Sequence, residues 1–215
     1  RRGIFIMKAD KHFFDTVRPL FRGKLTQAQV DGMVKIVEYA DKWGYSDLHT
    51  AYALATIKHE TANWMEPIRE GARRYGTNYT NAQAIRAVTS IFSKGIIRTN
   101  YALPAGPYKQ SYYGRGLVQI TWHGNYKQFD RLLNKPLEKN PDLALEWDTS
   151  LDIVFLGMRD GMFRKGNSLA MIKSANDFKK ARTIVNGDSA KRWGGPQRVD
   201  DKLAGYANVF LKALN

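Results

Sequence analysis

The 215-residue sequence contains no cysteine, and this absence excludes two classes of architecture. Without thiols, neither a disulfide-stapled extracellular scaffold nor a thiolate metal site can form. The four histidines do not cluster with other metal-ligating side chains, so we expect no metal ion and no other cofactor. Synthesis in a reducing cytoplasm fits this composition best.

Long hydrophobic runs are also missing. The apolar runs are only a few residues long, whereas a membrane-spanning helix needs about 20 apolar residues. The N-terminal stretch RRGIFIM has the charges of a secretory signal but too short an apolar part, so we expect no transmembrane segment and no signal peptide. We expect Met7 to be the natural start, with residues 1–6 a non-native remnant and residues 7–215 a single domain.

Acidic residues are scarce relative to basic ones. Twenty Asp and Glu face thirty-four Lys and Arg, which gives a formal net charge of +14. Such an excess concentrates polyanions at the surface, and nucleic acid, an anionic membrane surface or a carboxylate-bearing bacterial cell wall would all qualify. Solubility alone would also explain the charge. No nucleic-acid-binding motif is recognisable, so we expect no specific nucleic-acid partner.

What the sequence does contain is helical periodicity along most of its length. Three segments have the apolar spacing of helices and a Thr or Ser as N-cap: 26–44, 46–61 and 80–95. The second should bury its apolar residues along one face. The side chains expected to be buried on the third are Ile85, Val88 and Phe92.

The periodicity is lost from Ile96 to Gly116, which predicts a long loop, and GLVQITW is predicted to form a short strand next to it. Helical spacing resumes afterwards in four further segments: 125–134, 149–163, 167–187 and 196–214. The predicted fold class is therefore mainly α, with a small β-hairpin.

The stretch ALATIKHETANWMEPIREG, residues 53–71, carries three carboxylates, Glu60, Glu66 and Glu70. Cleaving a glycosidic bond needs one carboxylic acid to protonate the leaving oxygen and a second carboxylate to activate water or to attack the sugar. Glu60 suits the acid role, because the negative end of a helix disfavours ionisation of a carboxyl in its last turn. Trp64, which we expect to line the cleft wall and contact the substrate, would act in the same direction by desolvating the carboxyl.

The partner of Glu60 must lie close to it in space, yet ten helical residues would place Glu70 about 15 Å away along the axis. We expect the helix to break near Pro67, because the residue before a proline disfavours the α conformation. We prefer Glu70 as the partner, and Glu66 remains the alternative. The carboxylates could also be surface charges that balance nearby basic residues, Arg69, Arg73 and Arg74.

A second stretch, YYGRGLVQITWHGNY at residues 112–126, combines aromatic and neutral hydrogen-bonding side chains. Gln119, Thr121 and Asn125 on alternate positions of a short strand and its exit could face one side. Such groups suit hydroxyl and acetamido substituents, while aromatic rings such as Tyr112 and Tyr113 suit the apolar faces of sugars.

Together the two stretches resemble glycoside hydrolase family 19, the chitinase family that also includes bacteriophage endolysins. HET at 59–61 is similar to the acid-bearing motif of the family, and residues 112–121 are similar to its YYGRGPIQLT signature. Shorter similarities follow in NPDLAL at 140–145, ARTIVNG at 181–187 and QRVDDKLAGY at 197–206.

The resemblance implies a lysozyme-like helical fold of two lobes around a deep cleft, and inversion of the anomeric centre by single displacement. It implies Glu60 as general acid, Glu70 as the base that activates water and Thr121 as the residue that positions this water. Inversion predicts that the two carboxyl groups stand about 6.5–9.5 Å apart. The residues that resemble sugar-binding or cleft-lining groups are Gln119, Asn125, Asn186 and Arg198. His59 is expected to be a structural hydrogen-bonding residue.

The sequence departs from the plant chitinases in lacking cysteines and in the short segment between its two glutamates. The short segment resembles the phage lysozyme branch, whose substrate is peptidoglycan. We therefore expect a monomeric endolysin, a single catalytic domain without a wall-binding module, that is attracted to the anionic cell envelope. It would be made in the host cytoplasm and released to the wall at lysis. A chitinase is the enzymatic alternative, and a non-catalytic basic wall-binding protein is the alternative of another class.

Overall fold

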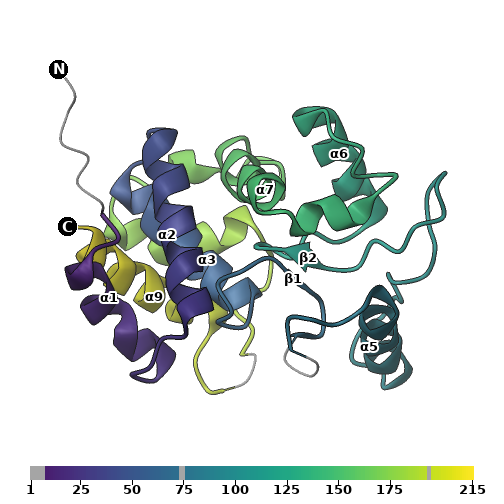
Figure 1. The fold of residues 1–215 in the computed structure, drawn as a ribbon, viewed down its shortest axis with the longest axis horizontal. Coiled ribbons are helices and arrows are strands. Elements are labelled where there is room, and N and C mark those ends of the chain that lie inside the picture. The colour runs from purple at the N-terminus through teal and green to yellow at the C-terminus, as the bar shows by residue number, and fades with distance from the viewer. Residues whose placement is uncertain (1–7, 73–75, 193–194) are drawn as a thin grey trace. The chain divides into compact units, whose positions relative to one another are not determined.

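The computed structural model describes residues 8–72, 76–192 and 195–215. The predicted remnant at residues 1–6 and the predicted start at Met7 lie outside the described residues, as do Arg73 and Arg74. The chain divides into two compact units, one formed by Arg1–His59 with Phe155–Asn215 and the other by Glu60–Val154. Both are mainly helical, and the second contains a small hairpin (Figure 1).

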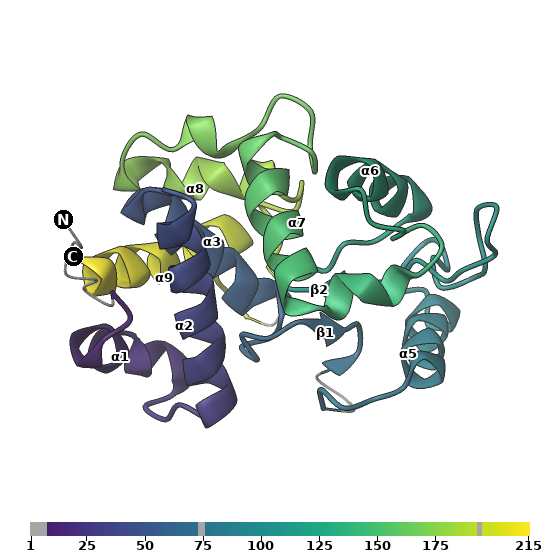
Figure 2. The ribbon, with the colours of Figure 1, turned by 45° about the horizontal axis from the view of Figure 1, so that its top comes forward.

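The first unit is an assembly of helices. Its longer members are α1 (Lys11–Val17), α2 (Gln27–Lys42), α3 (Asp47–Glu60), the end of α7 (Trp147–Arg159) and α9 (Val199–Leu214). Its short helices and turns are η1 (Arg18–Phe21), η3 (Leu169–Met171), η4 (Ala175–Asp177), α8 (Phe178–Ala181) and η5 (Arg182–Ile184). Helix α9 packs against α1 and α8 (Figures 1 and 2), and the rings of Phe13 and Phe210 stack with centroids 6.3 Å apart.

The predicted helix starts are confirmed by their caps. The Thr26 side chain accepts from the Gln29 backbone N–H at 3.2 Å, and the Gln29 side chain accepts from the Thr26 N–H at 2.9 Å, which closes a capping box. Ser46 Oγ accepts from the His49 N–H at 3.2 Å at the start of α3. These local hydrogen bonds depend on residue type and spacing alone, which is why the sequence reveals them.

Helix α3 corrects one expectation, because it is buried all round rather than along one face. Each residue from 50 to 58 is buried, including Lys58, whose ammonium lies over the rings of Phe21 and Tyr206. A helix that is mostly apolar on every side lies inside its unit. Glu60 is the last residue of this central helix.

The second unit carries β1 (Ile68–Arg69), α5 (Asn81–Ser93), β2 (Arg115–Gly116), α6 (His123–Leu133), η2 (Pro141–Leu145) and the start of α7. The two strands pair antiparallel, with Ile68 opposite Gly116 and Arg69 opposite Arg115. The predicted strand over GLVQITW is wrong, since the chain turns back between Arg115 and Ile120 with Gln119 in the left-handed region at φ 53°.

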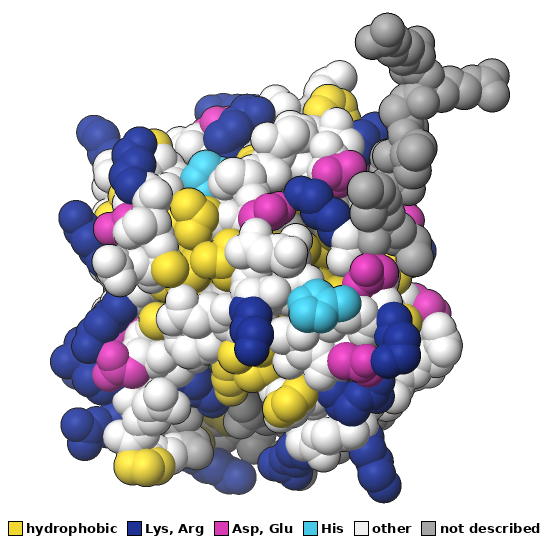
Figure 3. Space-filling model, turned by 90° about the vertical axis from the view of Figure 1, so that its left-hand side faces the viewer, with side chains coloured by type: hydrophobic (Ala, Val, Ile, Leu, Met, Phe, Trp, Pro, Cys, Tyr) yellow, Lys and Arg dark blue, Asp and Glu magenta, His cyan; other side chains and the backbone are white. Residues whose placement is uncertain are grey.

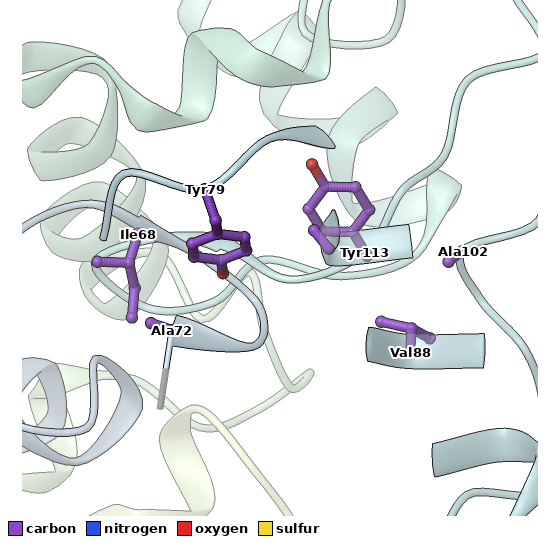
Figure 4. Packing of buried hydrophobic residues seen from close by; sticks show 7 residues of the cluster. Ile68, Ala72, Tyr79, Val88, Ala102 and Tyr113 are labelled. Carbon is purple, nitrogen blue, oxygen red and sulfur yellow. The ribbon is translucent and has the colours of Figure 1, made fainter. Parts of the chain in front are cut away.

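Seven buried residues of this unit, one of them in β1, form a hydrophobic cluster (Figure 4), namely Ile68, Ala72, Tyr79, Ala84, Val88, Ala102 and Tyr113. The prediction that Phe92 is buried is wrong, because its side chain is 42% exposed. The buried residues of α5 are Ala84 and Val88, which lie two turns and one turn earlier.

The predicted helix over 167–187 is also wrong as a continuous element, since η3, η4, α8 and η5 divide it. The Asp177 carboxylate accepts from the backbone N–H groups of Lys173 and Ser174, both at 2.9 Å, and so starts a new turn. Within the described residues, no helix combines the length and apolarity that crossing a membrane requires.

Candidate active site

Arg69 and Arg115 lie opposite each other in the hairpin, and both form ion pairs with the carboxylate of Asp142. Asp142 in η2 accepts from Arg69 Nη2 through Oδ2 and from Arg115 Nε through Oδ1, the latter at 2.7 Å. Arg115 is buried and also donates to the carbonyl of Ser111 at 2.9 Å. Like charges opposite each other destabilise a strand pair, so the shared carboxylate is what permits this register. This ion-pair cluster gives Asp142 of NPDLAL a structural role at the hairpin.

Tyr112 and Tyr113 belong to the interior of this unit, which leaves no exposed ring face on which a sugar could stack. Their exposures are 1% and 0%. The Tyr112 hydroxyl donates to the carbonyl of Glu138 at 2.7 Å, and the Tyr113 hydroxyl donates to Asn81 Oδ1 at 2.6 Å. The Arg115 guanidinium lies over the Tyr113 ring, 3.7 Å from its centroid. Both tyrosines therefore support the hairpin.

Trp64 packs, partly buried, against the same hydrophobic cluster. Its backbone N–H donates to the carbonyl of Thr61 at 3.0 Å, which fixes it in the turn after α3. This packing gives Trp64 a structural role, and its predicted contact with substrate stays a prediction.

The chain reverses immediately after Glu60, earlier than the position of Pro67 suggested. The turn uses three left-handed residues, Ala62, Asn63 and Met65, with φ of 51°, 76° and 57°. Such backbone conformations are unfavourable outside glycine and persist where the surroundings impose them. Pro67 follows this turn and leads into β1, after which the Glu70 N–H donates to the carbonyl of Gly114 at 2.8 Å.

Three predicted site residues converge at Gly114. Its backbone N–H donates to Glu70 Oε2 at 2.9 Å. A Cβ placed on Gly114 would lie 2.8 Å from Gln119 Oε1, 3.1 Å from Glu70 Oε2 and 3.4 Å from Thr121 Oγ1. The structure thus brings together the predicted base, the predicted water-positioning hydroxyl and a predicted sugar-binding amide, around a position with room for little more than a hydrogen.

Hydrogen bonds orient these polar groups. Gln119 Nε2 donates to the carbonyls of Ile68 and Gly116, each at 3.0 Å, so its Oε1 is directed to Gly114. Thr121 Oγ1 donates to the Gln119 carbonyl at 2.9 Å, which leaves oxygen lone pairs available to a water molecule. Asn125 Nδ2 donates to the Thr121 carbonyl at 2.7 Å. The turn, and not strand alternation, places these side chains together.

Tyr101, which the sequence analysis did not single out, completes the surroundings of Glu70. Its hydroxyl donates to Glu70 Oε1, so both carboxylate oxygens accept a hydrogen bond. Burial raises the pKa of Glu70, against the opposing effects of the Tyr101 and Gly114 hydrogen bonds and the Arg115 charge. Burial and the Glu70 charge raise the pKa of Tyr101, which keeps its proton on the hydroxyl. A carboxylate whose pKa moves toward neutrality suits a general base.

These contacts favour Glu70 over Glu66 as the base, because it is the Glu70 carboxylate that lies at Gly114. They also weaken the surface-charge interpretation, since Arg69 pairs with Asp142 and donates to the Tyr113 hydroxyl at 3.1 Å. Among the described residues, no group of three or more His, Cys, Asp or Glu side chains could hold a metal ion.

Asn186 and Arg198 belong to the first unit. Asn186 is exposed and its Oδ1 accepts from the Gly187 N–H at 2.7 Å. Arg198 precedes α9 and donates to both carboxylate oxygens of Asp200, at 3.0 and 2.6 Å. Their implied position beside Glu60 stays a prediction, as does the separation between the carboxyl groups of Glu60 and Glu70.

His59 lies near a buried ion pair in the first unit. Arg182, 1% exposed, donates to both oxygens of Asp188, at 2.7 and 3.0 Å. Burial would raise the pKa of Asp188, but the hydrogen bonds and charge of Arg182, together with His59, lower it overall. This location is compatible with the structural role expected of His59. Arg182 of ARTIVNG has a structural role in the same ion pair.

Comparison with known proteins gives local similarity in sequence. No protein family model matches the chain. An endochitinase of Arabidopsis thaliana is 39% identical over 57 residues, which cover 25% of this chain and 20% of that protein. Endochitinase 2 of Gossypium hirsutum is 37% identical over 93 residues, 42% of this chain and 28% of that protein. The chain thus spans between a fifth and a third of these relatives.

The similarity in structure extends over the whole chain. Chitinase C from Streptomyces griseus aligns with 100% of this chain and 79% of its own, with a TM-score of 0.56 and 21% identity. A mutant of chitinase C aligns with 99% of this chain and 95% of its own, with a TM-score of 0.57 and 22% identity. The chain therefore shares the fold of chitinase C, which confirms the predicted fold class.

Replacing Gly114 by alanine should disable the site while the protein stays folded. The added methyl would displace the oxygens of Glu70, Gln119 and Thr121 by a few tenths of an ångström or more, and we expect glycosidic-bond hydrolysis to fall by about 10²-fold. Turnover of a soluble amino-sugar oligomer and the circular dichroism spectrum should be measured together. Gly124→Ala is the matched control, because a Cβ there meets nothing within 4 Å. Full activity in folded Gly114→Ala would contradict the assignment.

Replacing Tyr101 by phenylalanine should move the acid limb of the pH–activity profile to higher pH. The lost hydrogen bond stabilised the charged carboxylate, so the pKa of Glu70 rises further without it. A general base acts only in its ionised form. With a higher pKa, Glu70 becomes protonated at a higher pH as the pH is lowered, and activity is lost there. The pH dependence of kcat/KM measures this, with exposed Tyr108→Phe from the same loop as control. An unmoved acid limb would argue against Glu70 as the base.

Proposed function

We propose that the protein is a family 19-type glycoside hydrolase that cleaves β-1,4 bonds between N-acetylated amino sugars with inversion. The convergence of Glu70, Gln119 and Thr121 at Gly114 is the observation that carries this proposal. A half-buried carboxylate with a raised pKa, a neighbouring hydroxyl and a neighbouring amide are the groups that water activation beside a sugar requires. The shared fold with chitinase C supports the same class.

In the proposed reaction, Glu70 removes a proton from a water molecule that Thr121 Oγ1 also holds. The oxygen of this water attacks the anomeric carbon from the side opposite the leaving oxygen. Glu60, at the C-terminal end of α3, donates its proton to that leaving oxygen as the glycosidic bond breaks. Gln119 and Asn125 hold the substituents of the sugar. After one turnover, Glu70 carries a proton and Glu60 has lost one, and exchange with solvent restores both.

Peptidoglycan is the substrate we propose, with the role of a phage endolysin released to the wall at lysis. Two features support it: the short segment between Glu60 and Glu70, and the net charge of +14, which would draw the protein to an anionic wall. On the face drawn in Figure 3, Lys and Arg side chains are scattered among polar and apolar ones and outnumber the Asp and Glu side chains.

Chitin is the second candidate, and a specific observation favours it. The local identities of 37–39% are to proteins named endochitinases, and the fold is shared with chitinase C. Chitin is neutral, so the basic surface would then serve solubility. Digesting purified peptidoglycan and purified chitin side by side, and identifying the reducing end that each releases, separates the two substrates.

The catalytic assignment predicts a contrast among the three carboxylates of residues 60–70. Glu60→Gln removes the acid, and Glu70→Gln removes the base, so each should lower kcat by about 10²–10⁴-fold. Glu66→Gln is the matched control and should retain nearly full activity. Release of reducing ends from both polymers gives the measurement. Wall lysis that survives Glu60→Gln would show the glycosidase mechanism to be wrong and would favour a basic wall-binding protein.

The dependence on salt should distinguish electrostatic attraction to the wall from hydrolysis of the glycosidic bond. Raising the ionic strength shortens the Debye length from about 10 Å at 0.1 M to about 3 Å at 1 M, so the lysis rate of intact walls should fall. Hydrolysis of a short neutral oligomer should change little over the same range. Equal salt dependence for both substrates would contradict a role for the basic surface.

A further inference from the structure

Trp122 is an aromatic residue of residues 112–126 to which the sequence analysis gave no role. The other rings of this stretch that could stack on a sugar are buried, with Tyr112 at 1% exposure and Tyr113 and Tyr126 at 0%. Trp122 is 48% exposed and directly follows Thr121, the proposed water-positioning residue. It therefore presents an open aromatic face where the buried tyrosines cannot.

The indole is linked to the proposed base through a single residue. The rings of Tyr101 and Trp122 meet edge to face, with centroids 5.1 Å apart and an interplanar angle of 62°. The Tyr101 hydroxyl in turn donates to Glu70 Oε1. The Tyr101 ring thus contacts the indole, while its hydroxyl contacts the proposed base.

The backbone of Trp122 is held in an unfavourable conformation. Its φ is 76°, a value that bulky residues seldom adopt. The Trp122 N–H donates to the Tyr112 carbonyl at 2.8 Å, and its own carbonyl accepts from the Asn125 N–H at 3.1 Å. The half-exposed ring gains little from burial in return. Unfavourable backbone at an exposed aromatic residue beside a reactive group indicates function.

We propose that Trp122 is a sugar-stacking platform, on which one ring of the bound amino-sugar chain rests beside Glu70 and Thr121. The C–H face of a pyranose is apolar and packs against an indole, while its substituents remain free to reach Gln119 and Asn125. This inference rests on the proposed function and adds a residue that holds the glycan chain. In this arrangement the exposed Trp122 offers the stacking surface that the buried rings of Tyr112 and Tyr113 do not.

The test compares Trp122→Ala and Trp122→Phe with Trp43→Ala, an exposed tryptophan of the first unit, 61% exposed. The probes are a β-1,4-linked N-acetylglucosamine hexamer and soluble glycan strands of peptidoglycan. Calorimetry in the Glu60→Gln background gives Kd, and steady-state hydrolysis in the otherwise wild-type background gives KM and kcat. We expect about a tenfold rise in Kd and KM for Trp122→Ala with a smaller fall in kcat, partial recovery in Trp122→Phe, and no change in Trp43→Ala.

Thermal unfolding of each variant controls for loss of fold. Trp122→Ala that remains folded and binds both glycans as tightly as the parent overturns the platform, even if hydrolysis by the wild type establishes the proposed function. The same holds if Trp122→Phe binds no better than Trp122→Ala, since a ring in either residue should stack. Conversely, Trp122-dependent binding without hydrolysis of either polymer supports the platform and overturns the proposed reaction.

Discussion

The shared carboxylate of Asp142 is the interaction on which the site depends. A two-residue strand pair has too few hydrogen bonds to stand alone, and this one places two arginines opposite each other. Asp142 offsets their repulsion by pairing with both Arg69 and Arg115. Because Glu70 follows Arg69 and Gly114 precedes Arg115, the same ion pairs that fix the hairpin also bring the base to its partners.

Residues 112–121 divide into residues that support the hairpin and residues that belong to the proposed site. Tyr112, Tyr113 and Arg115 are buried and hold the hairpin through hydrogen bonds and a cation–π contact. Gln119 and Thr121 lie at the surface of that support, and Gly114 leaves the space that they and Glu70 surround. The aromatic residues of the stretch are thus mostly structural, and its small and polar residues are those to which we assign the proposed chemistry.

The sequence predicted best what depends on neighbouring residues. Caps at Thr26, Ser46 and Thr80 identified helix starts. The resemblance pointed to Glu70, Gln119 and Thr121, which the structure brings together at Gly114. Contacts between segments that are distant in the sequence could not be predicted from it. Tyr101 reaches Glu70 across 31 positions from a loop without periodicity, and the left-handed turn at Gln119 could not be distinguished from a strand by alternation. The burial of Tyr112 and Tyr113, which were expected to stack on sugars, could not be predicted because composition does not show which aromatic rings are buried.

In the proposed reaction, Glu70 activates a water molecule for a single displacement, with no covalent intermediate. The anomeric configuration of the first product distinguishes this reaction from one with a covalent intermediate. Proton NMR during early hydrolysis of a β-1,4-linked N-acetylglucosamine hexamer follows the new reducing end before mutarotation. Inversion predicts that the α-anomer appears first and then equilibrates. Initial release of the β-anomer would mean retention and would contradict the role given to Glu70.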